Sequence, residues 1–445
     1  MPRFGGRSWQ LAYPVPVDRP LRDVATNDPR LASALVAALD GSGPAVRPIP
    51  PAGVGSDERT SDEPASDEPA DAGRVADEHV ADGRAPAERR SAECVPAGVA
   101  VVLRTSGSTG APRDVMLSAA ALRASAAATQ HRLGGPGDWL LALPPDHVAG
   151  LQVLLRALAA GTGAHRMPSG PFRAVGFAEA AAALPPGRRY TSLVPTQLVR
   201  LLDDAAGPAT LRSFDAVLLG GAAVAPALLD RAREAGARVV TTYGMTETCG
   251  GCVYDGVPLD GVRVSLDPDR RIQLAGPVLA DGYLGGPGPD VSGPGGPGSG
   301  GSASGVRGLD GFVDDEGTRW LRTADLGRLS PDGRLEVLGR ADDVIVTGGV
   351  NVAPGPVEHL LAALPGVREA CVVGVPDEEW GQAVVAVLVV GPQVPPSLDS
   401  VRALVGERLG PAAAPRRLLV VPALPLRGPG KPDRRATAIL AAATP

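Results

Sequence analysis

The sequence predicts an α/β protein with a large N-terminal domain of parallel sheets, a small β-rich subdomain, and a small α+β C-terminal domain. Between residues 99 and 241, apolar segments of strand length alternate with segments of helical spacing, a pattern typical of parallel sheets covered on both faces. Residues 262–274 and 311–338 have instead the short alternating strands of antiparallel structure. From Gly339 the pattern changes again, to a unit of about 100 residues, which is the size of a separate domain.

Each element follows from its local pattern. The expected strands of the α/β region are Val99–Leu103, Leu140–Leu143, Ser192–Val194, Ala216–Leu219 and Arg238–Thr241. Its expected helices are Ala119–His131, Ala149–Ala160, Thr196–Ala205 and Ala225–Ala235. In the β-rich region, the expected turns are Asp310-Gly311 and Asp332-Gly333. The C-terminal unit should contain a strand at Val344–Val346, a helix at Pro356–Leu364, and strands at Val367–Val373 and Ala383–Val390. We therefore expect domains at residues 1–340 and 341–445.

Composition and charge exclude several classes of protein. The 445 residues carry a net charge of −6 and no basic stripe with interleaved aromatic residues, which argues against nucleic-acid binding. No apolar run is long enough for a transmembrane helix, and the N-terminus lacks the apolar core of a signal peptide. We therefore expect a cytoplasmic protein that does not bind membranes. Aromatic residues make up only 3% of the chain, so the core must be built from Ala, Val and Leu.

Two low-complexity segments interrupt these patterns. Residues 53–90 contain a repeated Ser-Asp-Glu triplet, and residues 285–308 are mostly Gly, Pro and Ser. Such segments cannot bury enough apolar surface to offset the entropy lost on ordering, so we expect both to be disordered insertions. The alternative for the first is an acidic protein-binding element. The alternative for the second is a dinucleotide-binding loop, although its glycines follow no strand-then-helix pattern.

Two of the four cysteines, Cys249 and Cys252, have the spacing of a metal or redox site. A structural zinc needs four ligands, usually from a second pair, and no second pair is present in the sequence. A redox dithiol usually opens a helix after a strand in a small βαβ domain. We interpret both cysteines as small residues that line a loop.

A Ser/Gly-rich loop follows the first strand of the α/β region, from Arg104 to Arg113. Its glycines allow tight turns and close approach to a polyanion, and its hydroxyl and backbone N–H groups can bind phosphate. A Walker A loop is excluded because no Gly-Lys-Ser/Thr follows at the required spacing. The alternative is an ordinary Ser/Gly turn between a strand and a helix.

Lys431 is the only lysine in the chain. A composition rich in Ala, Gly, Pro and Arg indicates a bias that replaces lysine by arginine wherever any positive charge suffices. An ammonium group is a compact point charge, whereas guanidinium is a wide planar fork. The one remaining lysine therefore points to a role that arginine cannot fill, against the alternative of a chance survivor in a solvated tail.

The loop at residues 105–113 resembles the phosphate loop of the adenylate-forming superfamily, which includes acyl-CoA synthetases, peptide-synthetase adenylation domains and luciferases. Further segments resemble the motifs of that superfamily, in the same order and over nearly the whole expected fold. These segments are Gly220–Ala223, Thr242–Thr248, Thr323–Asp325, Gly339–Asp343, Gly348–Val352 with Glu358, and Gly430–Arg434. Any one of them alone is a weak signal, but the ordered set is specific.

The resemblance implies the fold of this superfamily, with a mobile C-terminal domain hinged at Asp342, and the use of ATP, Mg²⁺ and CoA. It implies that Lys431 and His147 are catalytic residues, with His147 lining the acyl or CoA channel. Glu247 suits an inner ligand of Mg²⁺ on the ATP phosphates, with a catalytic role, and Asp325 suits the ribose diol. Taken alone, Glu247 could equally be an N-cap partner, Asp325 a turn residue and His147 a core residue. The expected ATP-binding residues are Thr105, Ser106, Gly107, Ser108, Thr109, Gly110, Arg113, Gly221, Ala222, Tyr243, Gly244, Thr246, Asp325 and Arg340.

Within the superfamily, the chain resembles the compact o-succinylbenzoate–CoA ligases of the menaquinone pathway. The similar segments are Pro144–Gln152, Ser192–Leu198 and Thr248–Gly256. Two positions depart from the superfamily pattern: residue 113 is Arg instead of Lys, and Thr-Ala-Asp replaces Thr-Gly-Asp at 323–325. The expected reaction joins a small carboxylic acid to CoA through an acyl-AMP. The alternatives are another acyl- or aryl-CoA ligase, an enzyme that loads a carrier protein, and a degenerate nucleotide-binding regulator. A homodimer is left open.

Overall fold

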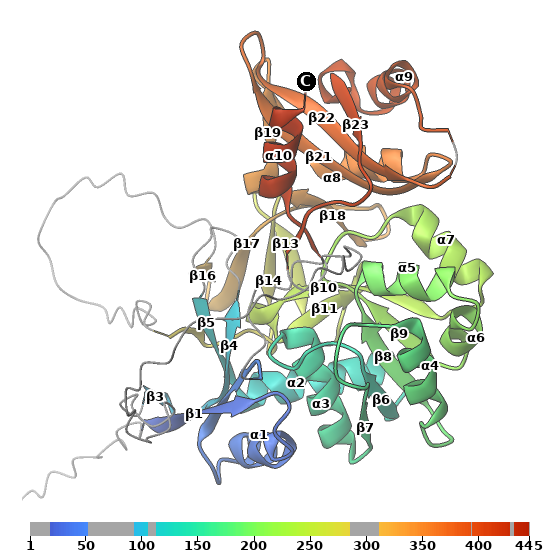
Figure 1. Ribbon diagram of the computed structural model, residues 1–445. Coiled ribbons are helices and arrows are strands. Elements are labelled where there is room, and N and C mark those ends of the chain that lie inside the picture. Colours follow the sequence, from blue (N-terminus) through green and yellow to red (C-terminus); the bar gives the residue numbers. More distant parts are fainter. Residues whose placement is uncertain are drawn as a thin grey trace, which may run out of the picture.

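The computed structural model describes residues 18–51, 93–105, 113–284, 311–392, 394–427 and 431–444, without the side chains of Arg427 and Lys431. The insertions expected at 53–90 and 285–308, and the expected loop residues 106–110, lie outside these ranges. Figure 1 shows a large body that runs from β1 to β18, with a smaller α+β unit from the C-terminal part of the chain above it. This architecture confirms the predicted fold class. None of the helices within the described ranges combines the length and apolar character that crossing a bilayer requires.

The first sheet of the large body has six strands in the order β15-β5-β4-β2-β1-β3. Its strands β1, β2 and β4 are parallel, whereas β3, β5 and β15 pair antiparallel with their neighbours. Thr105 lies opposite Arg113 at the ends of β4 and β5, so this pair brackets the segment predicted to bind phosphate. The elements are β1 (Arg19–Ala25), α1 (Leu31–Asp40), β2 (Ala45–Ile49), β3 (Cys94–Val95), β4 (Val99–Thr105), β5 (Arg113–Ser118) and β15 (Gly282–Tyr283).

The second sheet has seven strands in the order β12-β11-β10-β9-β8-β6-β7. The strands from β7 to β10 are parallel, as the sequence predicts, and β11 and β12 add an antiparallel edge. Its strands are β6 (Asp138–Leu141), β7 (Ala164–Arg166), β8 (Arg189–Leu193), β9 (Ala216–Leu219), β10 (Val239–Met245), β11 (Gly250–Tyr254) and β12 (Val257–Pro258). The accompanying helices are α2 (Ala119–Arg132), α3 (Val148–Ala160), α4 (Ala174–Ala182), α5 (Pro195–Asp203), α6 (Gly207–Arg212), α7 (Pro226–Glu234) and the 3₁₀ turn η1 (Thr246–Thr248).

The third sheet is the expected β-rich subdomain, and one of its two predicted turns is wrong. Asp332-Gly333 does lie in the turn between β17 and β18, but Gly311 begins strand β16, and Asp310 lies outside the described residues. The tight turn before β17 is Glu316-Gly317, where φ is +47° and +76°. A two-residue hairpin turn with both φ values positive matches strand twist, and here Glu takes the place usually held by Asn or Asp. The strands are β13 (Arg263–Leu266), β14 (Arg271–Ala275), β16 (Gly311–Asp315), β17 (Thr318–Leu329) and β18 (Leu335–Arg340).

The C-terminal unit, which follows β18, has its own apolar core around the sheet β21-β22-β23. It contacts the large body through α8, which touches both α7 and β18. The approach to β18 is close, because a Cβ added at Gly355 would lie 2.3 Å from the carbonyl oxygen of Leu338. Its elements are η2 (Ala341–Asp343), β19 (Ile345–Thr347), β20 (Val350–Val352), α8 (Pro354–Ala362), β21 (Val367–Asp377), β22 (Gly381–Val390), α9 (Leu398–Leu409), η3 (Pro411–Ala413), β23 (Arg417–Val420), β24 (Leu426–Arg427), β25 (Lys431–Pro432) and α10 (Arg434–Ala443).

Candidate active site

The candidate site lies where the parallel strands of the seven-stranded sheet end. In a parallel sheet all carboxyl ends meet at one edge, which is the usual ligand site of α/β folds. Gly221 and Ala222 follow β9, and the segment from Tyr243 to Glu247 spans the end of β10 and η1. His147 is the N-cap of α3, the helix that follows β6, so it lies at the same edge.

Glu247 is held by a tyrosine that the sequence analysis did not single out. Its side chain is buried, with the residue 8% exposed, and its Oε1 accepts a hydrogen bond of 2.9 Å from the hydroxyl of Tyr283. The guanidinium of Arg113 lies over the ring of Tyr283, 4.4 Å from the centroid. One tyrosine therefore connects the predicted metal ligand with the arginine at the end of the predicted phosphate loop. The only local signal was an aromatic residue in a chain poor in aromatics.

A second group joins β10 to the β-rich sheet. The hydroxyl of Tyr243 donates a hydrogen bond of 2.8 Å to Oδ2 of Asp325. Burial raises the pKa of Tyr243 well above its ordinary value, and the charge of Asp325 adds to the rise, so the phenol stays protonated and acts as the donor. Arg340 lies across from Asp325 in the β17–β18 ladder, with their side chains 3.7 Å apart, and also donates a hydrogen bond of 3.0 Å to Asp342.

Two glycines of the site are required by the path of the backbone. The pairing of β10 with β11 shifts register between Tyr243 and Gly244, as at a β-bulge. A Cβ added at Gly244 would lie 2.1 Å from the carbonyl oxygen of Gly250, so no larger residue fits there. Gly221 has a φ of +84°, a conformation that glycine adopts without steric cost. Close backbone approach at Gly244 and a positive φ at Gly221 thus explain why glycine occupies two of the predicted ATP-binding positions.

The cysteine pair belongs to the wall of this region. Cys249 has a φ of +51° between η1 and β11, and its carbonyl oxygen accepts hydrogen bonds from Ser125 and Gln152. Cys249 and Cys252 are both buried, and neither forms a disulfide. Burial raises the pKa of the Cys252 thiol to about 12, which disfavours the thiolate that redox or metal chemistry needs. The structure therefore favours the interpretation of these cysteines as small residues that line a loop.

The remaining predicted residues are placed only in part. The backbone of Lys431 pairs with Arg427 in the β24–β25 hairpin, and its side chain lies outside the described part of the chain. Thr105 donates a hydrogen bond to the carbonyl oxygen of Arg113 at the base of the predicted phosphate loop. Thr246 begins η1. Their assignment to ATP binding and catalysis stays a prediction.

The donor set around Glu247 fits a magnesium ion that arrives with a nucleotide. Within the described ranges, no group of three or more His, Cys, Asp or Glu side chains could hold a metal ion. Mg²⁺ in nucleotide sites is usually bound by one or two carboxylates, with phosphates and water as the other ligands. Glu247 is one such buried carboxylate, and Tyr283 links it to Arg113 at the end of the predicted phosphate loop.

Comparisons with known proteins agree with this geometry. A family model described as AMP-binding enzyme matches residues 33–283, and one described as AMP-binding enzyme C-terminal domain matches residues 356–431. A probable 2-succinylbenzoate–CoA ligase of Mycobacterium tuberculosis is 47% identical over 351 residues, which cover 78% of this chain and 86% of the relative. The 2-succinylbenzoate–CoA ligase of Escherichia coli is 34% identical over 294 residues, covering 64% of this chain and 57% of that protein.

Two solved structures extend the comparison. The o-succinylbenzoate CoA synthetase of Bacillus subtilis, in complex with the acyl-adenylate intermediate, is similar with a TM-score of 0.61 and 28% identity, over 76% of this chain and 69% of the other. The amide bond synthetase McbA from Marinactinospora thermotolerans is similar with a TM-score of 0.65 and 25% identity, over 95% of this chain and 80% of the other.

Proposed function

Because the chain belongs to the family of AMP-binding enzymes, we propose that it is an AMP-forming ligase that joins 2-succinylbenzoate to CoA. The observation that carries this proposal is the 47% identity to the mycobacterial ligase over 86% of that protein's length. Tyr243, at the end of β10 near Glu247, bonds to Asp325, which faces Arg340 in the β-rich sheet. This link supports the proposal, because a nucleotide needs groups for its phosphates and its ribose at one place.

In the first half-reaction, the substrate carboxylate attacks the α-phosphate of ATP, and pyrophosphate leaves. Negative charge concentrates where the two anions meet, and fixed positive groups aimed at that point lower the barrier. Lys431 supplies an ammonium group for this purpose, and Arg113 supplies charge at the phosphates. Mg²⁺, when bound with ATP, neutralises phosphate charge, and Glu247 would hold it. Asp325 accepts hydrogen bonds from the ribose hydroxyls, beside the hydroxyl of Tyr243.

In the second half-reaction, the thiol of CoA attacks the acyl carbon of the acyl-AMP. A carbon–sulfur bond forms, the bond from the acyl carbon to the phosphate oxygen breaks, AMP leaves, and the thiol proton is released. Lys431 has no task in this step. The C-terminal unit therefore turns about Asp342 between the two steps, so that the lysine leaves and CoA enters along a channel that His147 lines.

The two half-reactions give a direct test. Exchange between ATP and labelled pyrophosphate should require an added acid, and 2-succinylbenzoate should support it better than benzoate, a fatty acid or an amino acid. Lys431→Ala should abolish this exchange and yet form the thioester from supplied acyl-AMP and CoA. Lys431→Arg should behave like Lys431→Ala, because the guanidinium fork is too wide for a point-charge role. Equal loss of both half-reactions in Lys431→Ala would refute the assignment of the lysine.

An amine acceptor is the second candidate, because the amide bond synthetase aligns over more of this chain than the Bacillus enzyme does. The first half-reaction is the same for both acceptors. Supplying acyl-AMP with CoA, or with a primary amine in its place, separates them. Faster turnover with the amine would replace the ligase assignment while leaving the adenylation assignment intact.

A further inference from the structure

Two residues of the expected motifs, Glu358 and Arg434, have no role in the scheme above, yet they contact each other. Both terminal nitrogens of Arg434 bind the carboxylate of Glu358, at 2.7 Å for the pair Nη2–Oε2. Arg434 also donates a hydrogen bond of 2.9 Å to the carbonyl oxygen of Val372 in β21. Its Nε lies 3.0 Å from Oδ2 of Asp343, the last residue of η2. One guanidinium thus joins α10, α8, β21 and the hinge turn.

The geometry requires arginine. Two parallel bonds to one carboxylate, with the Nε–H left for a second carboxylate, use the planar fork of donors that only guanidinium offers. Glu358 is only 12% exposed at its side chain, and its Oε1 also accepts a hydrogen bond of 2.7 Å from the backbone N–H of Val372. Burial lowers the pKa of Arg434, but the hydrogen bonds and charge of Glu358 outweigh it and leave the pKa raised, so the group stays charged.

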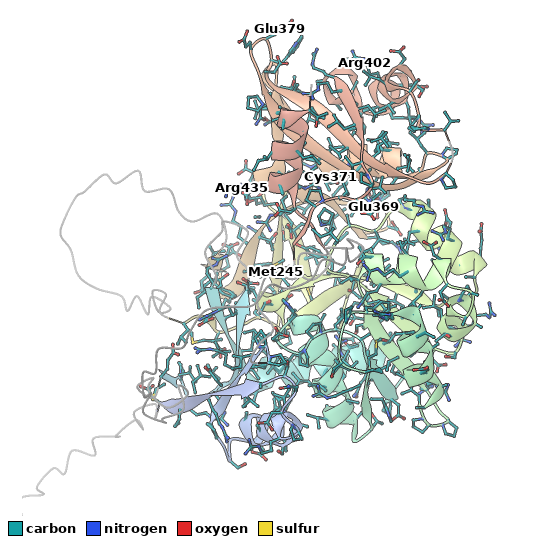
Figure 2. All side chains as sticks on the ribbon, viewed as in Figure 1. Met245, Glu369, Cys371, Glu379, Arg402 and Arg435 are labelled. Carbon is teal, nitrogen blue, oxygen red and sulfur yellow. The ribbon has the colours of Figure 1, made fainter. Side chains whose placement is uncertain are left out.

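The position of this cluster along the chain is informative. Arg434 is the first residue of α10 and follows Lys431 in the segment 431–434, here named the lysine segment. Asp343 directly follows Asp342, the expected hinge. In Figure 2, Cys371 and Arg435 lie in the part of the C-terminal unit nearest the large body. The sulfur of Cys371 lies 3.8 Å from Nη1 of Arg434. The cluster therefore joins the last residue of the lysine segment to the residue that directly follows the expected hinge, here called the pivot.

We propose that Arg434 is a positioning residue for Lys431. Its bonds to Glu358 and Asp343, here named the clamp, join the lysine segment and the residue after the hinge into one rigid body that turns about Asp342. This inference rests on the proposed function. It assigns two different tasks to the two acidic partners. Glu358 holds the lysine segment on α8, whereas Asp343 fixes the whole C-terminal unit to the pivot. Rotation is then confined to Asp342, the residue before Asp343, so rotation at this one residue brings the ammonium group of Lys431 to a fixed position at the site.

The two tasks predict different kinetic defects. Glu358→Gln keeps the acceptor for the N–H of Val372 but loosens the lysine segment, so it should lower kcat for adenylation and spare thioester formation from supplied acyl-AMP. Asp343→Asn should lower both half-reactions, because both depend on where the pivot places the C-terminal unit. Arg434→Lys should show both defects. Each loss should be about tenfold or more, since small displacements of a catalytic group cost up to about a hundredfold, with little change in KM for ATP.

Matched controls come from α9, where Arg408 and Asp399 are exposed and lie outside the clamp. Arg408→Lys and Asp399→Asn should leave both half-reactions unchanged. A second readout needs no substrate: Arg434→Lys should speed hydrogen exchange at the amides of Val344 and Asp433, which are hydrogen-bonded to Ala341 and Pro425. The two controls should leave these exchange rates unchanged.

Three outcomes would overturn the proposal. The first is that Arg434→Lys keeps the rates of both half-reactions within about twofold of those of the unmodified chain, since a lost positioning contact costs more than that. The second is that Glu358→Gln and Asp343→Asn lower the two half-reactions in the same proportion, and the third is that Arg434→Lys leaves hydrogen exchange at Val344 and Asp433 unchanged. Failure of the proposed function has a different signature. If the proposed function is wrong, no added acid will stimulate ATP–pyrophosphate exchange by the unmodified chain. Hydrogen exchange at the amides of Val344 and Asp433 will still report on the clamp.

Discussion

The contact between Tyr283 and Glu247 leads to the most specific prediction about the site. Tyr283→Phe removes one hydroxyl and keeps the ring, so Arg113 retains the aromatic face over which it lies at 4.4 Å. What is lost is the hydrogen bond of 2.9 Å to a buried carboxylate. The substitution therefore tests whether anchoring Glu247 matters for adenylation, separately from the stacking of Arg113.

The size of the effect follows from the burial of Glu247. A hydrogen bond to a charged group contributes about 1.5–3 kcal/mol, and removing one partner of a buried pair costs at the upper part of that range. Each 1.36 kcal/mol corresponds to about a factor of ten in rate. With Glu247 only 8% exposed, we expect ATP–pyrophosphate exchange to fall about tenfold to a hundredfold. The affinity for MgATP should weaken as well, which isothermal titration can measure without turnover.

Tyr190→Phe is the matched control. Its hydroxyl shares its one hydrogen between the carbonyl oxygens of Leu133 and Gly135, each 3.1 Å away, and the residue is 1% exposed. Its loss should lower thermal stability at least as much as Tyr283→Phe does, yet leave the exchange rate unchanged. Two results would refute the reasoning: an ATP–pyrophosphate exchange rate in Tyr283→Phe within twofold of that of the unmodified chain, or an equal loss of rate in Tyr190→Phe. The predicted tenfold effect comes only from the hydrogen bond between Tyr283 and the carboxylate of Glu247.

Three further predictions concern the ribose site and the thiols. Asp325→Asn removes the charge that faces Arg340 at 3.7 Å and weakens the acceptor for the ribose hydroxyls, so KM for ATP in the exchange assay should rise about tenfold with little change in kcat; a change in kcat alone would contradict it. Native protein should react with a thiol reagent at Cys94, which is exposed, and much more slowly at the three buried cysteines. Burial raises the pKa of Cys252 and of Cys371 from 9.0 to about 12, so above pH 9 the unfolded chain loses protons that the folded chain keeps. Stability present below pH 9 should therefore be lost as the pH rises towards 12, as alkaline unfolding monitored by circular dichroism would show.

The sequence predicted the elements whose pattern is local. Strand β9 has the bounds expected for Ala216–Leu219, and α2 extends the expected helix by one residue to Arg132. Both are short apolar or Ala-rich stretches whose burial follows from their own periodicity. The first elements, β1, α1 and β2, were not anticipated. Arg19 and Arg47, in β1 and β2, are buried although they are charged, so the apolar pattern that identifies strands is broken there.

The side-chain contacts of the site could not be predicted from local sequence patterns. Tyr283 and Glu247 are 36 residues apart, and Arg434 and Glu358 are 76 residues apart. No spacing rule relates such residues, because their meeting depends on how sheets and helices pack. Motif resemblance named Glu247 and Glu358 as positions of interest, but only the structure says what each one touches.

These contacts also explain why a chain with a single lysine is informative. Arg113 lies flat over an aromatic ring, and Arg434 binds one carboxylate with two parallel bonds and a second carboxylate with its Nε. Both arrangements exploit the planar guanidinium, so arginine is the better residue there whatever bias the composition has. Position 431 belongs to the same small cluster of elements, three residues before a clamp that demands the fork, and yet carries the point charge. A bias that acted without regard to chemistry would have replaced it, so the contrast between 431 and 434 argues that the ammonium group is retained for its shape.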